Sequence, residues 1–491
     1  MTRYLAELLI VCTLLGMNQP ALAQAPDTLW TKTIGTDGSD DGNAVRQTAD
    51  GGFIVAGWTQ RPGAGQTDMI LIRTNAGGDT LWTKAFGDSS LEIGYSLDLT
   101  SDGGYIMIGK TSPAVLSSAD LLLVRTDANG APMWTRTYGT ESGNDIGRSV
   151  LQTSDSGFVL VGSTTSFGAG QSDVWLIRTN ANGDTLWSKT YGGSNIEEAT
   201  SIDRTSDGGF IISAYTLSFG AGNVDGWLIR TDAYGDTLWT RTYGGTRPDF
   251  PRAVQQTSGG GFIMTGETLA DGQTGFDVWL VRTDANGDTL WTKRYGEGSD
   301  DKGSSVRQTS DGGFIIAGEY RVPPFGAIPD VWLIRTDADG DTLWTKILGG
   351  SGFDQAFSVQ QTSDGGYIAV GRTTSFGAGG SDPLLIRVSP ENPTGIDVQA
   401  STVPGQFQLL QNYPNPFNPK TIIHYQLSTD SYVSLSVYDL LGREVAVLVN
   451  EKKAPGSYDV DFDASGLASG VYLYRLTAGQ SFQTRQMVLL R

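Results

Sequence analysis

The chain has 491 residues, and its 34 Lys and Arg against 53 Asp and Glu give a formal charge of −19. One His and one Cys exclude a zinc site built from several such ligands, and they exclude an intramolecular disulfide framework. The acidic balance argues against a nucleic-acid partner, because binding phosphates requires clustered positive charge.

The first 23 residues have the pattern of an export signal. Arg3 supplies a positive charge, residues 8–15 form an apolar core, and residues 21–23 read Ala-Leu-Ala, a small-x-small cleavage site. The apolar core is shorter than the ~20 residues that span a bilayer, and no other segment is long and apolar enough. We therefore predict a signal peptide over residues 1–23 and no transmembrane segment.

Residues 24–389 repeat a unit of 52 to 53 residues seven times. Each copy has a Trp in a Leu-Trp type pair, an aromatic residue after a Gly-rich turn, and an Asp that opens a DVWLIRT-type run. The Trp residues are Trp30, Trp82, Trp134, Trp187, Trp239, Trp291 and Trp344. The aromatic residues are Phe53, Tyr105, Phe158, Phe210, Phe262, Phe314 and Tyr367. The Asp residues are Asp68, Asp120, Asp173, Asp225, Asp277, Asp330 and Asp382.

Each copy predicts four short strands, as at residues 305–309, 312–318, 330–336 and 342–349. The inner runs are apolar throughout, which is typical of strands buried on both faces, as in the blades of a β-propeller. The chain opens with a fourth strand, residues 28–34, whereas the repeats end after a third strand, residues 383–389. We expect the opening strand to complete the last sheet. The predicted fold is all-β, with a seven-bladed β-propeller that is closed by its N-terminal strand.

The turn at residues 284–291, Asp-Ala-Asn-Gly-Asp-Thr-Leu-Trp, resembles the bacterial quinoprotein-like β-propeller repeats, in which a Gly turn precedes a docking Trp. Its spacing departs by one residue from that pattern, and it also departs from the sialidase Asp-box pattern. We therefore carry over neither family's chemistry.

Residues 390–404 are rich in Pro, Ser and Thr and are predicted to be a linker. Residues 405–491 then alternate apolar and polar, as at Val433, Leu435 and Val437, which predicts a small Ig-like β-sandwich. His424 is expected to point outward from one of its strands. This segment has seven basic and seven acidic residues, so the negative charge of the chain lies wholly before it.

Ordered motifs in the same segment resemble the type A C-terminal sorting domain of the type IX secretion system. They are QNYPNPFNP at residues 411–419, TIIHYQL at 421–427, VYDLLGREV at 437–445, SGVYLYRL at 469–476 and QMVLLR at 486–491. The resemblance implies export through the periplasm of a Gram-negative bacterium and recognition by the outer-membrane secretion machinery. The protein would then be secreted or held at the cell surface. The residues that carry this implied sorting signal are Asn412, Pro414, Asn415, Pro416, Phe417, Gly442, Arg443, Gly470 and Tyr472.

One face of the predicted propeller is expected to carry the binding chemistry. The first-to-second and third-to-fourth strand turns hardly vary, whereas the connections at the opposite face differ between copies, and variable loops on a rigid scaffold are where ligands bind. At this face, the fifth residue after each second-strand aromatic also varies between copies, and only Glu occurs twice. These residues are Trp58, Lys110, Ser163, Tyr215, Glu267, Glu319 and Arg372. Trp58, with Arg61 and Tyr215, would suit a sugar ring or a peptide.

An acid stands at the same place in each copy, five residues before the apolar residue of the first strand. The seven acids are Asp40, Glu92, Asp145, Glu197, Asp249, Asp301 and Asp354. If the first strands line the axis, these carboxylates form a ring near the channel mouth that could hold Ca²⁺. Because the acid recurs in every copy, the favoured interpretation is structural: each accepts backbone N–H bonds, and no cofactor is expected.

Two functions remain open from the sequence. The first is an exported or cell-surface binding or adhesion protein that recognises a glycan or a protein with its variable face. The second is a secreted polysaccharide hydrolase or lyase that uses paired carboxylates such as Asp40 and Asp41, Glu197 and Glu198, or Asp300 and Asp301. The acids are spread evenly over the copies, which favours the binding protein over the enzyme.

Overall fold

The computed structural model describes residues 25–60, 67–113, 118–296, 299–322, 328–391, 408–409, 412, 417, 419–427, 429–439, 442–454, 456–479 and 481–489. These residues form β-strands and no helix, and therefore no helix that could span a membrane. The chain divides into two compact units, residues 1–393 and 394–491. The predicted signal peptide and most of the predicted linker lie outside the described residues.

The first unit consists of four-stranded antiparallel sheets. One sheet contains β2 (Asp40–Gln47), β3 (Phe53–Gln60), β4 (Thr67–Thr74) and β5 (Thr80–Phe86). The next contains β6 (Leu91–Leu99), β7 (Tyr105–Ser112), β8 (Asp120–Thr126) and β9 (Pro132–Tyr138). It is followed by β10 (Asp145–Gln152), β11 (Phe158–Thr164), β12 (Asp173–Thr179) and β13 (Thr185–Tyr191). Then come β14 (Glu197–Arg204), β15 (Phe210–Thr216), β16 (Asp225–Thr231) and β17 (Thr237–Tyr243). They are followed by β18 (Asp249–Gln256), β19 (Phe262–Thr268), β20 (Asp277–Thr283) and β21 (Thr289–Tyr295). The sheet after it contains β22 (Lys302–Gln308), β23 (Phe314–Tyr320), β24 (Asp330–Thr336) and β25 (Thr342–Leu348).

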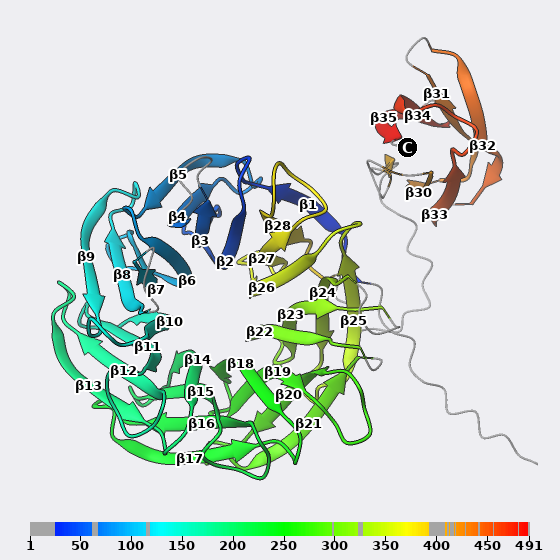
Figure 1. Cartoon of the computed structure of the whole chain (residues 1–491). Helices are drawn as coiled ribbons and strands as arrows, with labels where there is room; N and C mark the ends of the chain where they lie inside the picture. The colour runs from blue at the N-terminus through cyan, green and yellow to red at the C-terminus, as the bar shows by residue number, and fades with distance from the viewer. Residues whose placement is uncertain are drawn as a thin grey trace, which may run out of the picture. The chain divides into compact units, whose positions relative to one another are not determined.

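The remaining sheet combines both ends of this unit. β26 (Asp354–Gln361), β27 (Tyr367–Thr373) and β28 (Asp382–Val388) take β1 (Thr28–Thr33) as their fourth strand. β1 runs antiparallel to β28, with Trp30 opposite Arg387, which is the pairing expected from the sequence. The sheets follow one another around a common axis, with the first strand of each sheet innermost (Figure 1). This propeller-like arrangement is called the ring below.

Neighbouring sheets are joined by the repeated Trp. Trp82 on β5 packs against Tyr105 of the next sheet, with ring centroids 6.1 Å apart. Trp30 on β1 packs in the same way against Phe53, at 5.9 Å. The turn that follows the third strand covers the indole, and Gly78 at this turn has φ +79° and would place a Cβ 2.8 Å from the Trp30 ring. A glycine is therefore required there both by the backbone conformation and by the close approach.

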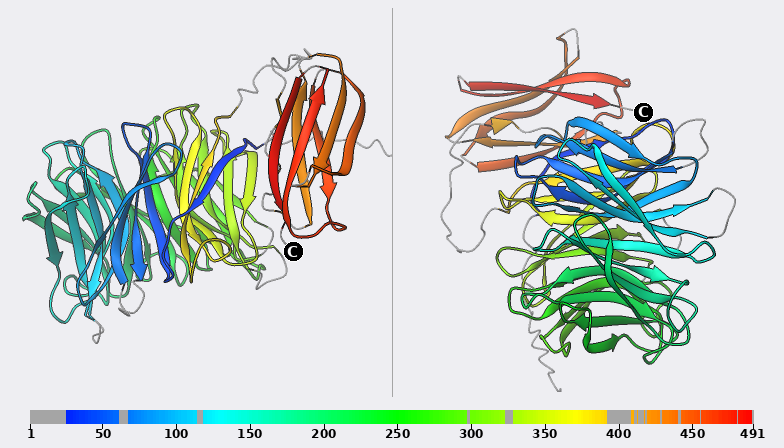
Figure 2. Two further views of the ribbon diagram at one scale, coloured as in Figure 1. Left: turned by 90° about the horizontal axis from the view of Figure 1, so that it is seen from above. Right: turned by 90° about the vertical axis from the view of Figure 1, so that its left-hand side faces the viewer.

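Hydrogen bonds at the inner edge repeat from one sheet to the next. The backbone N–H of Asp145 donates to the Ala119 carbonyl of the preceding sheet (2.6 Å), and that of Asp40 donates to Ser381 (2.7 Å). The boundary between the β2–β5 sheet and the sheet that contains β1 is therefore built like the others. Side views show these sheets side by side, with the connections gathered at the two ends of the strands (Figure 2).

An Arg on each third strand, buried in every sheet but β18–β21, contacts the first-to-second strand turn. Arg230, for example, donates from Nη2 to both carboxylate oxygens of Asp207, at 2.6 and 2.5 Å, and from Nη1 to the Phe210 carbonyl. The β18–β21 sheet differs, because Gly259 stands where its neighbours have Asp. Arg282 bonds the backbone there without a carboxylate partner among the described residues.

The second unit contains two sheets around one apolar core. The first is β29 (Gln408–Leu409), β30 (Lys420–Leu427) and β33 (Gly456–Asp463). The second is β32 (Glu444–Lys453), β31 (Ser431–Tyr438), β34 (Gly470–Ala478) and β35 (Ser481–Leu489). Alternate residues of β31, such as Val433, Leu435 and Val437, are fully buried, as expected for a strand with one face on the core.

Candidate functional site

The strand order separates two ends of the ring. β2 and β3 are joined by a short turn after Gln47, so the start of β2 and the end of β3 lie together at the opposite end. There each variable second-strand residue lies directly opposite a first-strand residue that also varies. The pairs are Asp41 with Trp58, Ile93 with Lys110, Ile146 with Ser163, Glu198 with Tyr215, Phe250 with Glu267, Lys302 with Glu319, and Gln355 with Arg372. The second-strand members were predicted from the sequence as ligand-binding residues, whereas of the first-strand members only Asp41 and Glu198 were named, as candidate catalytic carboxylates.

A β-bulge interrupts every first strand two residues further along. On β2 the register shifts between Gly42 and Ala44, so Asn43 has no partner residue on β3. The corresponding bulge residues are Asn43, Tyr95, Arg148, Thr200, Arg252, Ser304 and Phe357. A bulge turns its side chain away from the regular alternation, and all of these residues line one cavity of about 510 Å³.

This space, called the mouth cavity, is also lined by Glu198, Ala199, Tyr215, Lys302, Glu319 and Gln355. It continues into an inner cavity of about 270 Å³, which shares several bulge residues and adds Arg46, Asp203 and Arg307. The other residues of the mouth cavity lie at the start of the first strands and at the end of the second strands. The cavity therefore opens at the end of the ring where the connections vary between sheets. Its walls combine three cations, two carboxylates, three aromatic rings and neutral polar groups.

On one side of the mouth, buried carboxylates hold the cations. Arg252 contacts Glu267 at 2.6 Å, and Lys302 lies 3.2 Å from Glu319 and 3.8 Å from Glu267. Only 5% of the Glu267 side chain and 4% of the Glu319 side chain are exposed. Buried carboxylates require such partners, so in this sector the cations and the carboxylates of the protein pair with one another.

The network continues to the first sheet. Gln355 donates to Glu319, and Arg372 donates from Nε to Gln355 Oε1 at 2.9 Å. Arg372 also lies 3.7 Å from Asp41, which accepts a bond from Ser381 at 2.8 Å. Burial raises the pKa of Asp41, and the Ser381 hydrogen bond opposes that shift.

On the other side of the mouth, cations have fewer partners. The Arg148 guanidinium stacks over Tyr95 at 4.8 Å from the ring centroid, and its nearest acid, Glu198, is 3.8 Å away. Burial and then the neighbouring Glu198 charge raise the pKa of Tyr215. Burial lowers the pKa of Lys110, and the charge of Arg148 lowers it further.

Charged groups also line the inner cavity. Burial lowers the pKa of Arg307 to about 10, with a further contribution from Arg46 and an opposing one from Asp203 and Asp98. Asp98 is paired with Arg204 at 3.4 Å. Asp98 and Asp203 therefore offset the positive charges of Arg46 and Arg307 at this depth of the channel.

The seven acids at the first-strand positions do not line these cavities. They are 0–4% exposed and lie at the boundaries between sheets. Each accepts bonds from the connection before it or from the end of the second strand: Gly193 N and Thr216 Oγ1 donate to Glu197 at 2.7 and 2.8 Å, and Thr36 N donates to Asp40 at 2.6 Å. The side chains that reach the channel are the bulge residues instead, because the bulge, and not simple alternation, decides which residue turns to the axis.

Each of these acids faces the Asp that opens the third strand of the preceding sheet. A Cβ at Gly139 would collide with Oδ1 of Asp120 and Oδ2 of Asp145, and the same holds at Gly87 for Asp68 and Glu92. Burial and then the Asp145 charge raise the pKa of Asp120. The described residues contain no group of three or more His, Cys, Asp or Glu placed to hold a metal ion.

The structure therefore distributes the predicted ligand-binding residues unevenly. Tyr215 and Glu319 line the mouth cavity, and Glu267 and Arg372 support its wall. Trp58 is half-buried beside Asp41 and is separated from Tyr215 by intervening sheets. Arg61 and the variable loop that contains it lie outside the described residues. The recurring small-x-small pattern around each bulge residue, as in Gly42-Asn43-Ala44, was the signal that would have found the missing set.

In the second unit, the described sorting residues have structural roles. Asn412 is buried and donates from Nδ2 to Thr421 Oγ1 at 3.0 Å. Phe417 and Tyr472 belong to the core. Gly442 has φ +78° in the turn where Arg443 bonds Asp439 at 2.7 Å. Gly470 begins β34, whereas Pro414, Asn415 and Pro416 lie outside the described residues.

Residues 411–490 match the family model described as the secretion system C-terminal sorting domain. This match supports the type IX sorting-domain assignment made from the motifs, and it indicates secretion to the cell surface or the extracellular space of a Gram-negative bacterium. The resemblance of the repeat to quinoprotein-like propellers stays a prediction.

Other comparisons concern one curated protein and the fold. Over 174 residues, the chain is 27% identical to the regulatory protein FlaEY of Caulobacter vibrioides, a match that covers 30% of this chain and 18% of that protein. The fold is similar to a protein of unknown function from Dyadobacter fermentans (10% identity, 74% of this chain and 99% of that chain, TM-score 0.44). It is also similar to PorZ, a surface component of the type IX secretion system of Porphyromonas gingivalis (10% identity, 90% of this chain and 69% of that chain, TM-score 0.36).

Proposed function

We propose that this chain, which carries a sorting tail over residues 411–490, is an extracellular glycan-binding protein whose ligand enters the mouth cavity. In this proposal the ring is a seven-bladed β-propeller that β1 closes, and the two sheets of the second unit form an Ig-like sandwich. The signal peptide takes the chain to the periplasm, and the sorting unit engages the outer-membrane machinery.

The observation that supports binding at the mouth is the way in which the lining differs between repeats that are otherwise alike. The bulge residues share one backbone position and line one cavity, yet they include an amide, two hydroxyls, two guanidinium groups and two aromatic rings. The strands pair in the same register in every sheet whichever of these side chains stands at the bulge, so the repeat does not require the differences. Different side chains at equivalent positions around one cavity are suited to an asymmetric ligand.

The composition of the lining favours a sugar over an apolar ligand. Tyr95, Tyr215 and Phe357 supply rings on which a sugar face can stack, and Asn43 and Thr200 supply neutral donors and acceptors for hydroxyl groups. The cavity volume of about 510 Å³ lies within the range of small-molecule sites in proteins.

The second candidate is a polysaccharide hydrolase or lyase, and the presence of Glu198 and Glu319 in one cavity favours it. Glycoside hydrolysis needs one carboxyl group that can donate a proton. Glu319 is instead held by Lys302 at 3.2 Å and accepts a bond from Gln355, and Glu198 lies between Tyr215 and Arg148. Both carboxylates are therefore already engaged by groups of the protein, which favours binding over acid catalysis.

The test is a glycan array probed with the purified full chain, followed by calorimetry with the best ligand. Tyr215→Ala should weaken binding by about tenfold, since stacking contributes roughly 1–1.5 kcal/mol. The matched control is Tyr234→Ala, because Tyr234 is 71% exposed and lies on a third-to-fourth strand turn at the other end of the ring. The proposal fails if no glycan binds or if both variants bind like wild type. Release of reducing sugar that Glu198→Gln abolishes would establish the enzyme instead.

A further inference from the structure

We infer that the glycan recognised at the mouth cavity carries a carboxylate, as a uronic acid does, and that Lys110 and Arg148 bind this group. The inference rests on the proposed function and names the ligand class of the same cavity. It follows from the uneven distribution of charge around the mouth.

In the sector formed by the β18–β21 and β22–β25 sheets, the cations already form ion pairs with carboxylates of the protein. Glu267 lies between Arg252 and Lys302, and Glu319 contacts Lys302. An anionic ligand would have to compete there with buried, fixed acids. That sector therefore suits neutral parts of a ligand.

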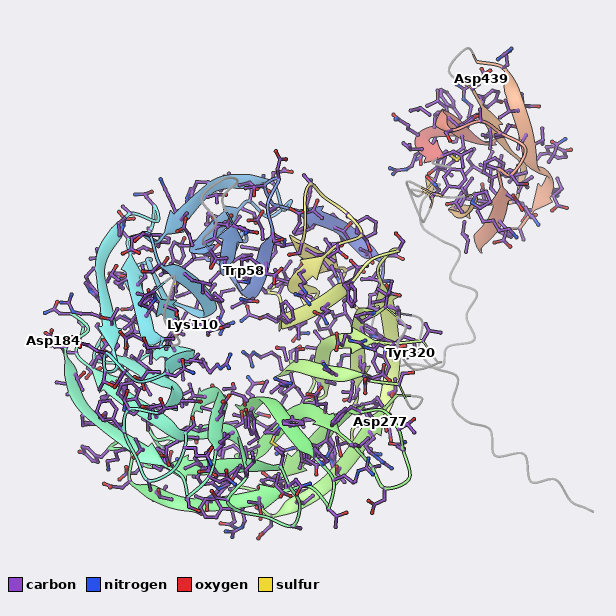
Figure 3. All side chains as sticks on the ribbon, viewed as in Figure 1. Trp58, Lys110, Asp184, Asp277, Tyr320 and Asp439 are labelled. Atoms are coloured by element: carbon purple, nitrogen blue, oxygen red, sulfur yellow. The ribbon has the colours of Figure 1, made fainter. Side chains whose placement is uncertain are left out.

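The sector formed by the β6–β9 and β10–β13 sheets is different. Lys110 lies opposite Ile93, two residues before the bulge residue Tyr95, and Arg148 of the next sheet stacks on the Tyr95 ring. Among the described residues Lys110 has no carboxylate within ion-pair distance, and the contact of Arg148 with Glu198, at 3.8 Å, is long for a hydrogen-bonded pair. Lys110 lies toward the centre of the ring, whereas Asp184 lies at its outer rim (Figure 3).

Lys110 lacks an acid within ion-pair distance among the described residues, and Arg148 has only the 3.8 Å contact with Glu198, so the charge of these two half-buried cations is incompletely offset. Burial and mutual repulsion both disfavour their charged forms, and the pKa of Lys110 is lowered by burial and by Arg148. A bound anion would offset both effects. A carboxylate also matches the planar guanidinium of Arg148 with two parallel hydrogen bonds.

The rest of the lining identifies the anion as part of a sugar. The Tyr95 ring and Arg148 line the mouth cavity, where Thr200 and Ser304 add hydroxyl groups. Lys110 holds the second-strand position that Tyr215 and Glu319 hold in their own sheets. A uronic acid presents one carboxylate beside an apolar ring face and several hydroxyl groups, which is the combination that this wall complements. The formal charge of −19 on the chain repels long polyanions, so we expect a short uronate segment to bind best.

The experiment compares hexagalacturonate with its fully methyl-esterified form, which has the same length and no charge. Calorimetry on the full chain should give tighter binding of the free acid, and this preference should weaken with added salt. Lys110→Gln and Arg148→Gln should each weaken binding of the acid by about tenfold or more, because each removes a charge-assisted hydrogen bond. Each variant should therefore lose most of the preference for the acid over the ester, while the acid and the ester remain distinguishable in the wild type.

Lys84→Gln is the matched control, since Lys84 is an exposed residue of the outer strand β5, and thermal unfolding checks that every variant is folded. Equal affinity for acid and ester, or equal binding by Lys110→Gln and Lys84→Gln, overturns the inference while the proposed function stands. Failure of every sugar to bind, or binding of an acidic peptide alone, overturns the proposed function with it.

Discussion

At the scale of single residues, a buried Arg and a turn Asp form a well-defined ion pair in every sheet of the ring except β18–β21. In the first sheet, Thr48 Oγ1 donates to Asp50 at 2.7 Å and Arg73 Nη2 donates to both of its carboxylate oxygens at 2.6 Å. The Thr48 hydrogen bond, with Gly52 and Arg73, lowers the pKa of Asp50 to about 2. The stability from this carboxylate is present above pH 3.8 and is lost as the pH falls toward 2.

The β18–β21 sheet lacks this contact, and restoring it should stabilise the ring. A Cβ at Gly259 would lie 3.6 Å from Arg282 Nη2, an ordinary contact distance, and Gly259 does not have a positive φ. Gly259→Asp should therefore raise the free energy of unfolding by about 1 kcal/mol at pH 7, through the ion pair and the loss of a flexible glycine. Urea denaturation measures the change.

Gly259→Asn is the control, because it shares the shape and the entropy effect but lacks the charge. The gain of the Asp variant over the Asn variant should shrink as the pH falls below 3.8 and vanish below about pH 2, as expected for the equivalent Asp50. Equal stability of the two variants at pH 7 would show that the Arg282 ion pair contributes nothing.

At the scale of elements, the first strand of each sheet faces the third strand of its neighbour through two carboxylates. Asp120 Oδ1 is buried without a hydrogen-bond partner among the described residues and faces Asp145 across the bare α-carbon of Gly139. Two facing carboxylates repel each other when both are ionised. The repeat retains them because the first-strand acid fixes the connection and the third-strand Asp fixes the loop before it, as Asp173 does for Ala169 at 2.9 Å.

Removing one of the two charges should stabilise the sheet boundary at neutral pH. The pKa of Asp120 is raised above its unfolded value of 3.8 by burial and then by Asp145. The stability associated with the protonated Asp120 is therefore present below pH 3.8 and is lost as the pH rises through the raised pKa. Asp120→Asn should add about 1 kcal/mol at pH 8 and progressively less toward pH 4.

Asp339→Asn, a change at an exposed turn position, should have no such dependence on pH. Thermal unfolding across this pH range makes the comparison. If Asp120→Asn lowers the melting temperature at every pH, the two carboxylates cooperate with a bound cation or a shared proton, and the repulsion account is incorrect.

At the scale of the whole ring, β1 takes the position that the fourth strand has in the other sheets, and its Trp packs against the next sheet as theirs do. Trp30 and Trp82 pack against the next sheet with nearly equal ring separations, 5.9 and 6.1 Å. Trp30→Ala and Trp82→Ala should therefore each lower the free energy of unfolding by similar amounts, about 3 kcal/mol, measured in guanidinium chloride. Trp30→Ala should also promote self-association, because loosening β1 exposes the β28 edge. A Trp30 variant as stable as wild type would contradict ring closure by β1.

Much of the fold was predictable because local patterns recur. Strand positions, the Gly turns and the docking Trp follow from alternation, turn chemistry and repetition, and the vacancy after β28 identified β1 as its partner. The role of Glu391, which follows β28, was not predicted. Glu391 accepts bonds from Arg335 Nε (2.7 Å), Tyr367 Oη (2.6 Å) and Trp344 Nε1 (3.1 Å). Glu391 follows β28, where the other sheets have a turn into their fourth strand. No such turn joins β28 to β1, because these two strands come from opposite ends of the first unit.

The sequence by itself determined the repeats, the sheet that both ends of the ring share and the sorting tail, because each is written in local pattern and spacing. Only the tertiary structure decided which side chains meet in the channel. Regular alternation would not select Tyr95 or Arg148, but the bulge in each first strand turns them to the axis. Whether a cation there has an acid beside it depends on the neighbouring sheet, about 50 residues away in the chain and in contact only after folding.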